Sequence, residues 1–242
     1  MVLTQQSLAA RFDEVAAHVI CLDSDWESIA NQPEHNPASN TTAGNLLYTL
    51  YTSGSTGRPK AIAMPHRSLV NLIAWQCRRS THPLRTTQFA ALSFDVSFQE
   101  IFSTLCSGGV LALVDEDTRR DSHALLSLLN EEAVERLFVP FVALQSLAEV
   151  SSRSKTPPAT LTQVITAGEQ LKITASLRQM FAHLPQCTLD NHYGPTEAHV
   201  VTACMLTGDA GDWPDLPSIG GPIDNIQIYV LDDSLQPVPI GV

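Results

Sequence analysis

The chain has 242 residues, of which 44% are hydrophobic, and its mean hydropathy is +0.02. This apolar content suffices for a buried core and excludes a disordered chain. Its 14 Lys and Arg residues against 25 Asp and Glu residues give a net charge of −11, which argues against a nucleic-acid partner. No apolar stretch approaches the ~20 residues that a membrane span requires, so we expect a cytoplasmic protein without a membrane partner.

From residue 46 onward, short apolar runs alternate with segments of helical periodicity. This pattern is typical of an α/β fold in which helices pack on a parallel or mixed sheet. The predicted strands are residues 47–52, 60–64, 88–92, 110–114, 136–139, 163–166, 200–205 and 227–231. The predicted helices are residues 66–79, 96–106, 122–131, 141–149 and 173–182.

Helix 96–106 has its apolar residues on one side. Phe98, Ile101, Phe102 and Leu105 recur at helical spacing, and we expect this face to be buried. Asp95 then lies at the start of the helix.

A loop rich in hydroxyl groups and glycine follows the first predicted strand. Residues 52–60 read Thr-Ser-Gly-Ser-Thr-Gly-Arg-Pro-Lys. Glycines let a backbone approach a ligand closely, and hydroxyl and cationic groups suit a nucleoside triphosphate. The loop is not the common phosphate-binding loop, because Arg58 and Pro59 follow Gly57 in place of Lys and Ser or Thr. Taken alone, it could also be an ordinary hairpin turn.

A second motif follows the strand-like segment 187–189. Residues 190–197 read Asp-Asn-His-Tyr-Gly-Pro-Thr-Glu. An aromatic face can stack on a nucleobase, and a carboxylate just past a Gly-Pro turn can hold a divalent cation against phosphate oxygens. The alternatives are a core role for Tyr193 and a solvated surface position for Glu197.

Together and in this order, the two motifs resemble those of adenylate-forming, AMP-binding enzymes, and specifically the amino-acid adenylation domains of nonribosomal peptide synthetases. Further matching stretches are residues 94–97, 164–169, 219–222, 231–233 and 237–242. The resemblance implies ATP-dependent activation of an amino acid as aminoacyl-AMP, with ATP and Mg²⁺ as cofactors. The implied partners are the amino acid and the peptidyl carrier and condensation domains of the same synthetase, with loading onto a phosphopantetheine thiol.

The resemblance implies roles at the nucleotide. The phosphates would be held by Thr52, Ser53, Gly54, Ser55, Thr56, Gly57 and Lys60. Other nucleotide contacts would come from Asn191, His192, Tyr193, Gly194 and Thr196. Glu197 would be the Mg²⁺ ligand, and the catalytic residues would be His66, Thr56 and Glu197. A capping or surface role is the alternative for His66.

The resemblance also implies an amino-acid pocket. Asp95 would bind the α-ammonium group, with helix capping as the alternative. The rest of the pocket would be Val96, Gln99, Phe138, Ile165, Ala167, His192, Val200 and Val201. Because this wall carries no counter-charge, it cannot stabilise a charged side chain. The set resembles that of proline-activating domains, and proline is the best guess among compact apolar amino acids.

The resemblance further implies that residues 1–242 are a partial core from the large N-terminal domain, with the C-terminal lid domain absent. The family's ribose-binding aspartate and its lid lysine have no counterpart here, so we expect the isolated chain to bind ATP weakly and to turn over poorly or not at all. The alternatives are an acyl-CoA or aryl-acid ligase and a non-catalytic nucleotide-binding remnant.

Overall fold

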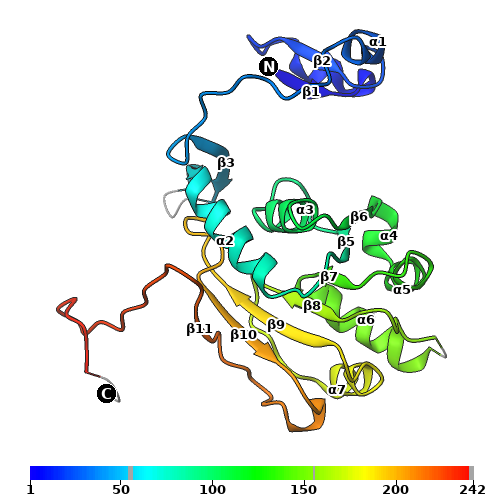
Figure 1. The fold of residues 1–242 in the computed structure, drawn as a ribbon, viewed down its shortest axis with the longest axis vertical. Coiled ribbons are helices and arrows are strands. Elements are labelled where there is room, and N and C mark those ends of the chain that lie inside the picture. The colour runs from blue at the N-terminus through cyan, green and yellow to red at the C-terminus, as the bar shows by residue number, and fades with distance from the viewer. Residues whose placement is uncertain (54–56, 155, 240–242) are drawn as a thin grey trace. The chain divides into compact units, whose positions relative to one another are not determined.

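The computed structural model describes residues 1–53, 57–154 and 156–239, and it divides into two compact units, Met1–Thr41 and Thr42–Val242. The first unit is small (Figure 1). It contains the parallel strands β1 (Val2–Thr4) and β2 (Val19–Cys21), the 3-10 helix η1 (Gln6–Phe12) and the short helix α1 (Trp26–Ala30).

The second unit begins with an antiparallel hairpin, whose two strands were predicted. Its strands are β3 (Leu46–Thr52) and β4 (Lys60–Pro65), and Thr52 pairs with Lys60 next to the loop that connects them. Helix α2 (His66–Arg78) follows directly and buries Leu69, Leu72 and Ile73.

A mixed sheet forms the centre of the second unit, as predicted. Its strand order is β11-β10-β9-β8-β7-β5-β6. Neighbouring strands from β6 to β9 are parallel, whereas β10 and β11 are antiparallel to their neighbours. The strands are β5 (Arg85–Gln88), β6 (Val110–Leu113), β7 (Arg136–Phe138), β8 (Gln163–Thr166), β9 (Thr188–Tyr193), β10 (Thr202–Leu206) and β11 (Gly221–Pro222).

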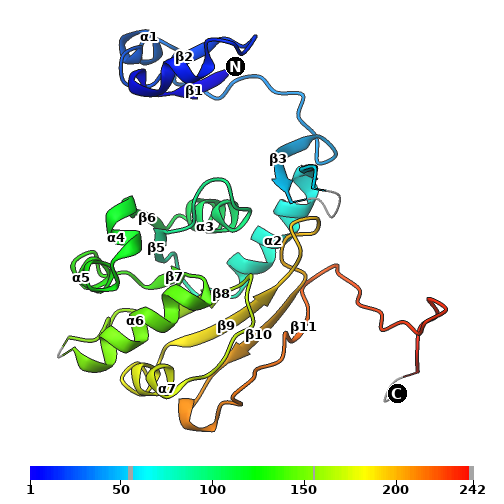
Figure 2. The ribbon, with the colours of Figure 1, turned by 180° about the vertical axis from the view of Figure 1, so that it is seen from behind.

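Helices connect the parallel strands and cover both faces of the sheet (Figures 1 and 2). They are α3 (Val96–Leu105), α4 (Glu116–Arg120), α5 (Ser122–Glu131), α6 (Phe141–Arg153) and α7 (Ala175–Ala182). The chain steps outward from β5 to β6 and then returns to β7 on the other side of β5. Right-handed crossovers therefore place α3 on one face and α5 and α6 on the opposite face. Among the described helices, none has the length and hydropathy of a membrane span.

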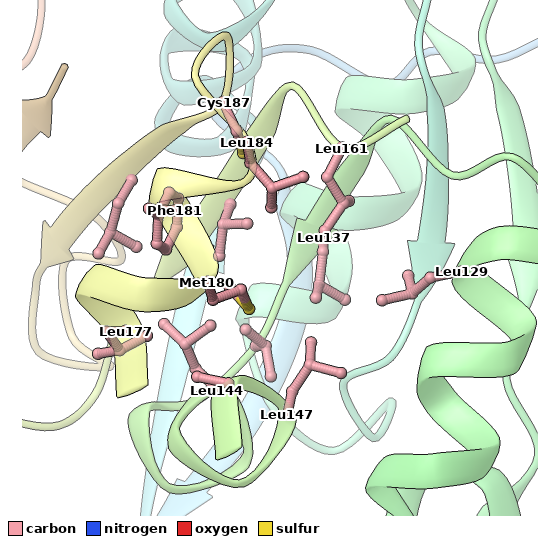
Figure 3. Packing of buried hydrophobic residues seen from close by; sticks show 14 of the residues in the cluster. Leu129, Leu137, Leu144, Leu147, Leu161, Leu177, Met180, Phe181, Leu184 and Cys187 are labelled. Carbon is pink, nitrogen blue, oxygen red and sulfur yellow. The ribbon is translucent and has the colours of Figure 1, made fainter. Parts of the chain in front are cut away.

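The main core lies between the sheet and helices α5, α6 and α7 (Figure 3). Leu137 of β7 packs there with Leu144 and Leu147 of α6 and with Leu177 and Met180 of α7, and all are 0% exposed. Truncating one of these side chains to alanine is expected to cost about 2–5 kcal/mol. The loops at the strand ends are thus anchored to a rigid layer.

The burial predicted for the apolar residues of α3 is wrong for Phe102 and Leu105, whereas Phe98 and Ile101 are half-buried. Phe102 is 37% exposed and Leu105 is 55% exposed. The side of the helix that is fully buried is polar and consists of Ser97, Gln99, Glu100, Ser103 and Thr104. The reason is a buried arginine beneath the helix, since Arg136 of β7 donates to the Thr104 hydroxyl at 3.0 Å. Polar side chains on α3 satisfy polar groups of the sheet that an apolar face would leave unpaired.

Some strand boundaries also differ from prediction. Residues 88–92 were predicted as a strand, but β5 ends at Gln88 and the apolar residues beyond it form a loop. The strand predicted at residues 200–205 begins at Thr202. For residues 227–231 the structure gives only an isolated bridge between Leu231 and Pro237.

Candidate functional site

A cavity of about 530 Å³ lies at the carboxyl edge of the parallel strands. Its walls come from the loops after β5, β7, β8 and β9 and from the start of α3. The chain changes direction between β5 and β7, and open α/β sheets bind ligands at such a switch point. The volume suits a small-molecule site. Among the predicted substrate-binding residues, those that line the cavity are Asp95, Val96, Phe138, Ile165, Ala167 and Val200.

Asp95 lines the cavity from the N-terminal end of α3. Its side chain makes no capping hydrogen bond, so the structure does not support the alternative of a helix-capping role. The residue is half-buried, so its carboxylate has lost part of its hydration. A positive charge beside the carboxylate is therefore favourable. Its carboxylate is therefore free to pair with a cation in the cavity.

His199 lines the same cavity and was not among the predicted site residues. It is 4% exposed, and its backbone φ is 59°. The imidazole Nε2 lies 3.0 Å from the carbonyl oxygen of Asp95, and its Nδ1 accepts from the Val200 N–H at 2.9 Å. These two contacts require a neutral ring with the proton on Nε2. Burial lowers the pKa of His199, although the charge of Asp95 opposes this effect, and the neutral form is favoured.

Tyr48 brings the hairpin to the same end of α3. Its ring stacks on Phe98 with 4.2 Å between the centroids. Burial, and then the negative charge of Asp95, raises the pKa of Tyr48 to about 12. The hydroxyl stays protonated and has no hydrogen-bond partner among the described residues. It is a donor near Asp95 that the sequence analysis did not identify.

Glu100 supports another wall of the cavity. It is 0% exposed, and its Oε1 accepts the backbone N–H of Phe89 at 3.2 Å and of Ala90 at 3.0 Å. Burial raises the pKa of Glu100 to about 7, against the lowering effect of these hydrogen bonds and of Arg119. Arg119 and Phe89 also line the cavity. Glu100 thus fixes the apolar loop after β5 that was predicted to be a strand.

The other predicted pocket residues lie beside the cavity wall and do not line it. Gln99 is 0% exposed, and His192 is 2% exposed. Gln99 Nε2 lies 3.5 Å from His192 Nδ1, so these two residues meet each other. Val201 is half-buried, and its N–H donates to the carbonyl oxygen of Tyr193 at 2.8 Å.

The second motif is divided between the cavity and its rim. Gly194 and Thr196 line the cavity, whereas Tyr193 is 48% exposed and Glu197 is exposed. A Cβ on Gly194 would lie 1.6 Å from the carbonyl oxygen of His199, so only glycine fits at this turn.

Asn191, another residue of this motif, is 4% exposed, and its Nδ2 donates to the carbonyl oxygen of Ser218 at 2.9 Å. Its side-chain amide is therefore already used within the protein.

The described residues of the first motif lie on the hairpin and are not among those that line the cavity. Thr52 and Lys60 face each other across β3 and β4, and Ser53 and Gly57 flank the tip. Gly57 has φ of 78°, a conformation that favours glycine. His66 is half-buried at the first position of α2. The remaining predicted phosphate-binding residues, Gly54, Ser55 and Thr56, lie outside the described residues.

Comparison with known proteins identifies the family. A family model described as "AMP-binding enzyme" matches residues 2–242. The chain belongs to the AMP-binding enzyme family. Over its whole length it is 37% identical to tyrocidine synthase 2 of Brevibacillus parabrevis and 35% identical to gramicidin S synthase 2 of Brevibacillus brevis. It spans 7% and 5% of the lengths of these two relatives.

A solved structure agrees with this assignment. The nonribosomal peptide synthetase FmoA3, in a form with α-methyl-L-serine-AMP bound, matches this AMP-binding enzyme with a TM-score of 0.86 and 25% identity. The match covers 98% of this chain and 26% of FmoA3. The family predicted from the two motifs is therefore confirmed, as is the mixed α/β fold.

Among the described residues, the Glu197 carboxylate could contribute to binding a metal ion that a nucleotide also binds. In residues 1–53, 57–154 and 156–239, no three His, Cys, Asp or Glu side chains form a group that could hold a metal ion. Glu197 is exposed and follows Thr196 of the cavity wall. A single carboxylate suits Mg²⁺ that is otherwise bound by water and phosphate oxygens.

Proposed function

We propose that this chain is the core of an amino-acid adenylation domain. An oxygen of the substrate carboxylate attacks the α-phosphorus of ATP, the bond to the bridging oxygen breaks, and pyrophosphate leaves while aminoacyl-AMP forms. The observation that carries the proposal is the Asp95 carboxylate at the wall of an otherwise largely apolar cavity at the switch point.

Asp95 selects substrates that carry an amine. An α-ammonium group would form a charge-assisted hydrogen bond with the carboxylate, which contributes about 1.5–3 kcal/mol. A fatty or aryl acid would leave the carboxylate partly desolvated and unpaired, so its binding would be penalised. The neutral His199 keeps a competing positive charge away from this position.

The side chain of the substrate would lie against Val96, Phe138 and Val200. These residues line the cavity from three separate segments and are uncharged. This part of the wall offers no counter-charge to a charged side chain, whereas Glu100, Arg119 and Glu169 line other parts of the cavity. A compact ring such as that of proline fits the uncharged part. Because one methylene changes discrimination by only about 1–3 kcal/mol, proline stays the best guess and other compact apolar amino acids are competitors.

The nucleotide would lie along the edge formed by Gly194 and Thr196, with Tyr193 at its rim. The lack of a Cβ at Gly194 lets the chain turn closely against the carbonyl oxygen of His199, and this turn presents Gly194 and Thr196 to the cavity. Glu197 would hold Mg²⁺, which supplies positive charge against the charge that develops on the phosphates. The described hairpin residues Thr52, Ser53, Gly57 and Lys60 would add donors to the β- and γ-phosphates, as would Gly54, Ser55 and Thr56.

The similar proteins support a place for the chain within a larger synthetase. Their names describe a tyrocidine synthase, a gramicidin S synthase and a nonribosomal peptide synthetase. On this basis, the aminoacyl-AMP is passed to the phosphopantetheine thiol of a carrier domain and then used by a condensation domain, in the cytoplasm.

An exchange assay tests the proposal. A synthetase module that carries this chain is supplied with ATP, labelled pyrophosphate and each amino acid in turn, and we expect exchange to be greatest with proline. Preference for a different compact apolar amino acid would correct the substrate. Exchange that is supported equally by carboxylic acids without an amine would overturn the proposal in favour of an acyl or aryl acid ligase.

A further inference from the structure

A line of buried polar side chains connects the end of α2 with α3 beside the cavity. A guanidinium nitrogen of Arg79 lies 2.5 Å from Asp190 Oδ2, and His192 Nε2 lies 3.0 Å from the same oxygen. On the other side of the ring, His192 Nδ1 lies 3.5 Å from Gln99 Nε2, which also donates to Gln76 Oε1 at 3.1 Å. We call these residues, Arg79, Asp190, His192, Gln99 and Gln76, the buried relay.

The buried relay is shielded from water except at Arg79. Asp190, Gln99 and Gln76 are each 0% exposed, and the Arg79 side chain is 18% exposed. The guanidinium also lies 4.4 Å from the ring centroid of Trp75, and the Trp75 and His192 rings are 5.4 Å apart. Burial raises the pKa of Asp190, but the hydrogen bonds from His192 and Arg79 and the charge of Arg79 outweigh it, so the pKa is lowered. Asp190 is an anion held by two partners.

The partners of the two ring nitrogens indicate the state of His192. Ionised Asp190 can only accept, so His192 Nε2 carries a proton. In the orientation of the Gln99 amide that the structure shows, its nitrogen faces His192 and can only donate, which matches an unprotonated Nδ1. His192 is therefore the neutral Nε2–H form, and Gln99 Oε1 faces away from it, without a partner among the described residues.

The buried relay joins two walls of the cavity. Gln99 belongs to α3, which supplies Asp95 and Val96 to the cavity. Asp190 belongs to β9 and pairs in register with Ile165 of β8, which also lines the cavity. The spacing between the amine-binding end of α3 and the apolar wall on β8 thus depends on hydrogen bonds that pass through His192.

We propose that Arg79 and Asp190 are positioning residues for substrate selection. They hold His192 as the neutral Nε2–H form, His192 orients the Gln99 amide, and the two walls keep the spacing that fits one amino acid. The effect on selection rests on the proposed function, whereas the state of His192 does not.

The state of His192 is tested by ¹⁵N NMR of the imidazole nitrogens in the 242-residue chain, with the signal assigned by a His192→Gln variant. At about pH 7.5 we expect a protonated Nε2 and an unprotonated Nδ1. Asp190→Asn, which removes the carboxylate charge, and Arg79→Gln should each shift the His192 signals toward a mixture of tautomers. Arg78→Gln is the matched control, because Arg78 is the preceding residue and pairs with Asp224 at the surface.

An imidazolium or an Nδ1–H form in the unmodified chain would overturn the proposal, as would unchanged His192 signals in both relay variants. If Asp190→Asn does not fold, Arg79→Gln and Arg79→Lys still test it, because Arg79 lies at the exposed end of the relay.

Selection is tested by amino-acid-dependent exchange in a module that carries the chain. We expect Arg79→Gln to raise the KM for the preferred amino acid by about tenfold and to reduce discrimination against its nearest competitor, with kcat little changed. Arg78→Gln should match the unmodified protein. Unchanged KM and discrimination in Arg79→Gln would overturn the proposed role in selection. Absence of exchange in the unmodified module would instead contradict the proposed function, and the NMR result would still decide the state of the relay.

Discussion

The His199 side chain is hydrogen-bonded to the backbone carbonyl of Asp95. The neutral imidazole donates from Nε2 to the carbonyl oxygen of Asp95, while the N–H of Val200 occupies Nδ1. A second proton would break the bond with Val200 and place a positive charge near the carboxylate that is proposed to bind an amine. The protonation state of a side chain that was not predicted from sequence therefore bears on the proposed substrate contact.

We expect amine binding to weaken as the pH falls. The pKa of His199 is lowered from its ordinary value of about 6.5, so the loss begins below that pH and is absent above it. Calorimetry with a prolyl-sulfamoyl adenosine, measured at a series of pH values, should show this decline in the unmodified chain and a smaller one in His199→Gln, which cannot acquire the charge. The same pH dependence in both chains would show that His199 plays no part.

Glu100 should make stability depend on pH in the opposite sense to an ordinary paired carboxylate. Its pKa is raised from 4.5 to about 7 in the folded state. The contribution of this group is therefore fully present below about pH 4.5 and is lost as the pH rises through about 7.

Replacement by glutamine keeps an oxygen acceptor and removes the charge. As the pH rises from about 4.5 to about 7.5, the unmodified chain should lose stability that Glu100→Gln keeps. The difference in free energy of unfolding between the two chains should therefore change by about 2–3 kcal/mol in favour of Glu100→Gln. Denaturant titrations of both chains at several pH values measure this difference. A difference that stays constant with pH would contradict the assignment.

The spacing of apolar residues predicted the helices better than apolar runs predicted the ends of the strands. Helices α2, α5 and α6 follow from apolar spacing, because each packs an apolar face on other apolar residues. Strand β5 was misplaced because Thr86 and Thr87 are 0% exposed, and buried threonines do not produce an apolar run. Thr86 is satisfied by Arg136 at 3.0 Å, a contact that depends on the tertiary structure.

Contacts that depend on the tertiary structure also limit what could be predicted of the site. Asp95, Val96 and Phe138 were named from the pocket that the family resemblance implies, and they line the cavity. His199 and Glu100 also line it but act through backbone groups of distant segments, which no local pattern reveals.

The turn between β9 and β10 should tolerate no side chain at Gly194. An added Cβ would meet the carbonyl oxygen of His199 at 1.6 Å, so Gly194→Ala must displace the segment that carries His199 and Val200. We expect a loss on the order of 3 kcal/mol in free energy of unfolding. Gly221→Ala is the control, because nothing lies within 4 Å of its added Cβ, and it should change stability by less than about 0.5 kcal/mol. Equal melting temperatures for the two variants would contradict the observed packing.

At the scale of the whole molecule, the strand order indicates where a ligand would bind, and the family indicates which reaction to propose there. The cavity lies where the strand order reverses between β5 and β7, and the family model covers residues 2–242. The order of helices and strands predicted an α/β sheet, but the strand order, and with it the switch point, comes only from the structure. The family determines the type of reaction that we propose, while the amine contact that we propose at Asp95 determines the class of acid.

The most direct test compares two ligands that differ only in the amine. Calorimetry measures the binding of prolyl-sulfamoyl adenosine and of its cyclopentanecarbonyl counterpart to the 242-residue chain and to its Asp95→Ala variant. The account predicts that the unmodified chain binds the amine-bearing ligand at least about tenfold more tightly, and that Asp95→Ala removes this preference. Equal affinity for the two ligands in the unmodified chain, or a preference that survives in Asp95→Ala, would contradict it.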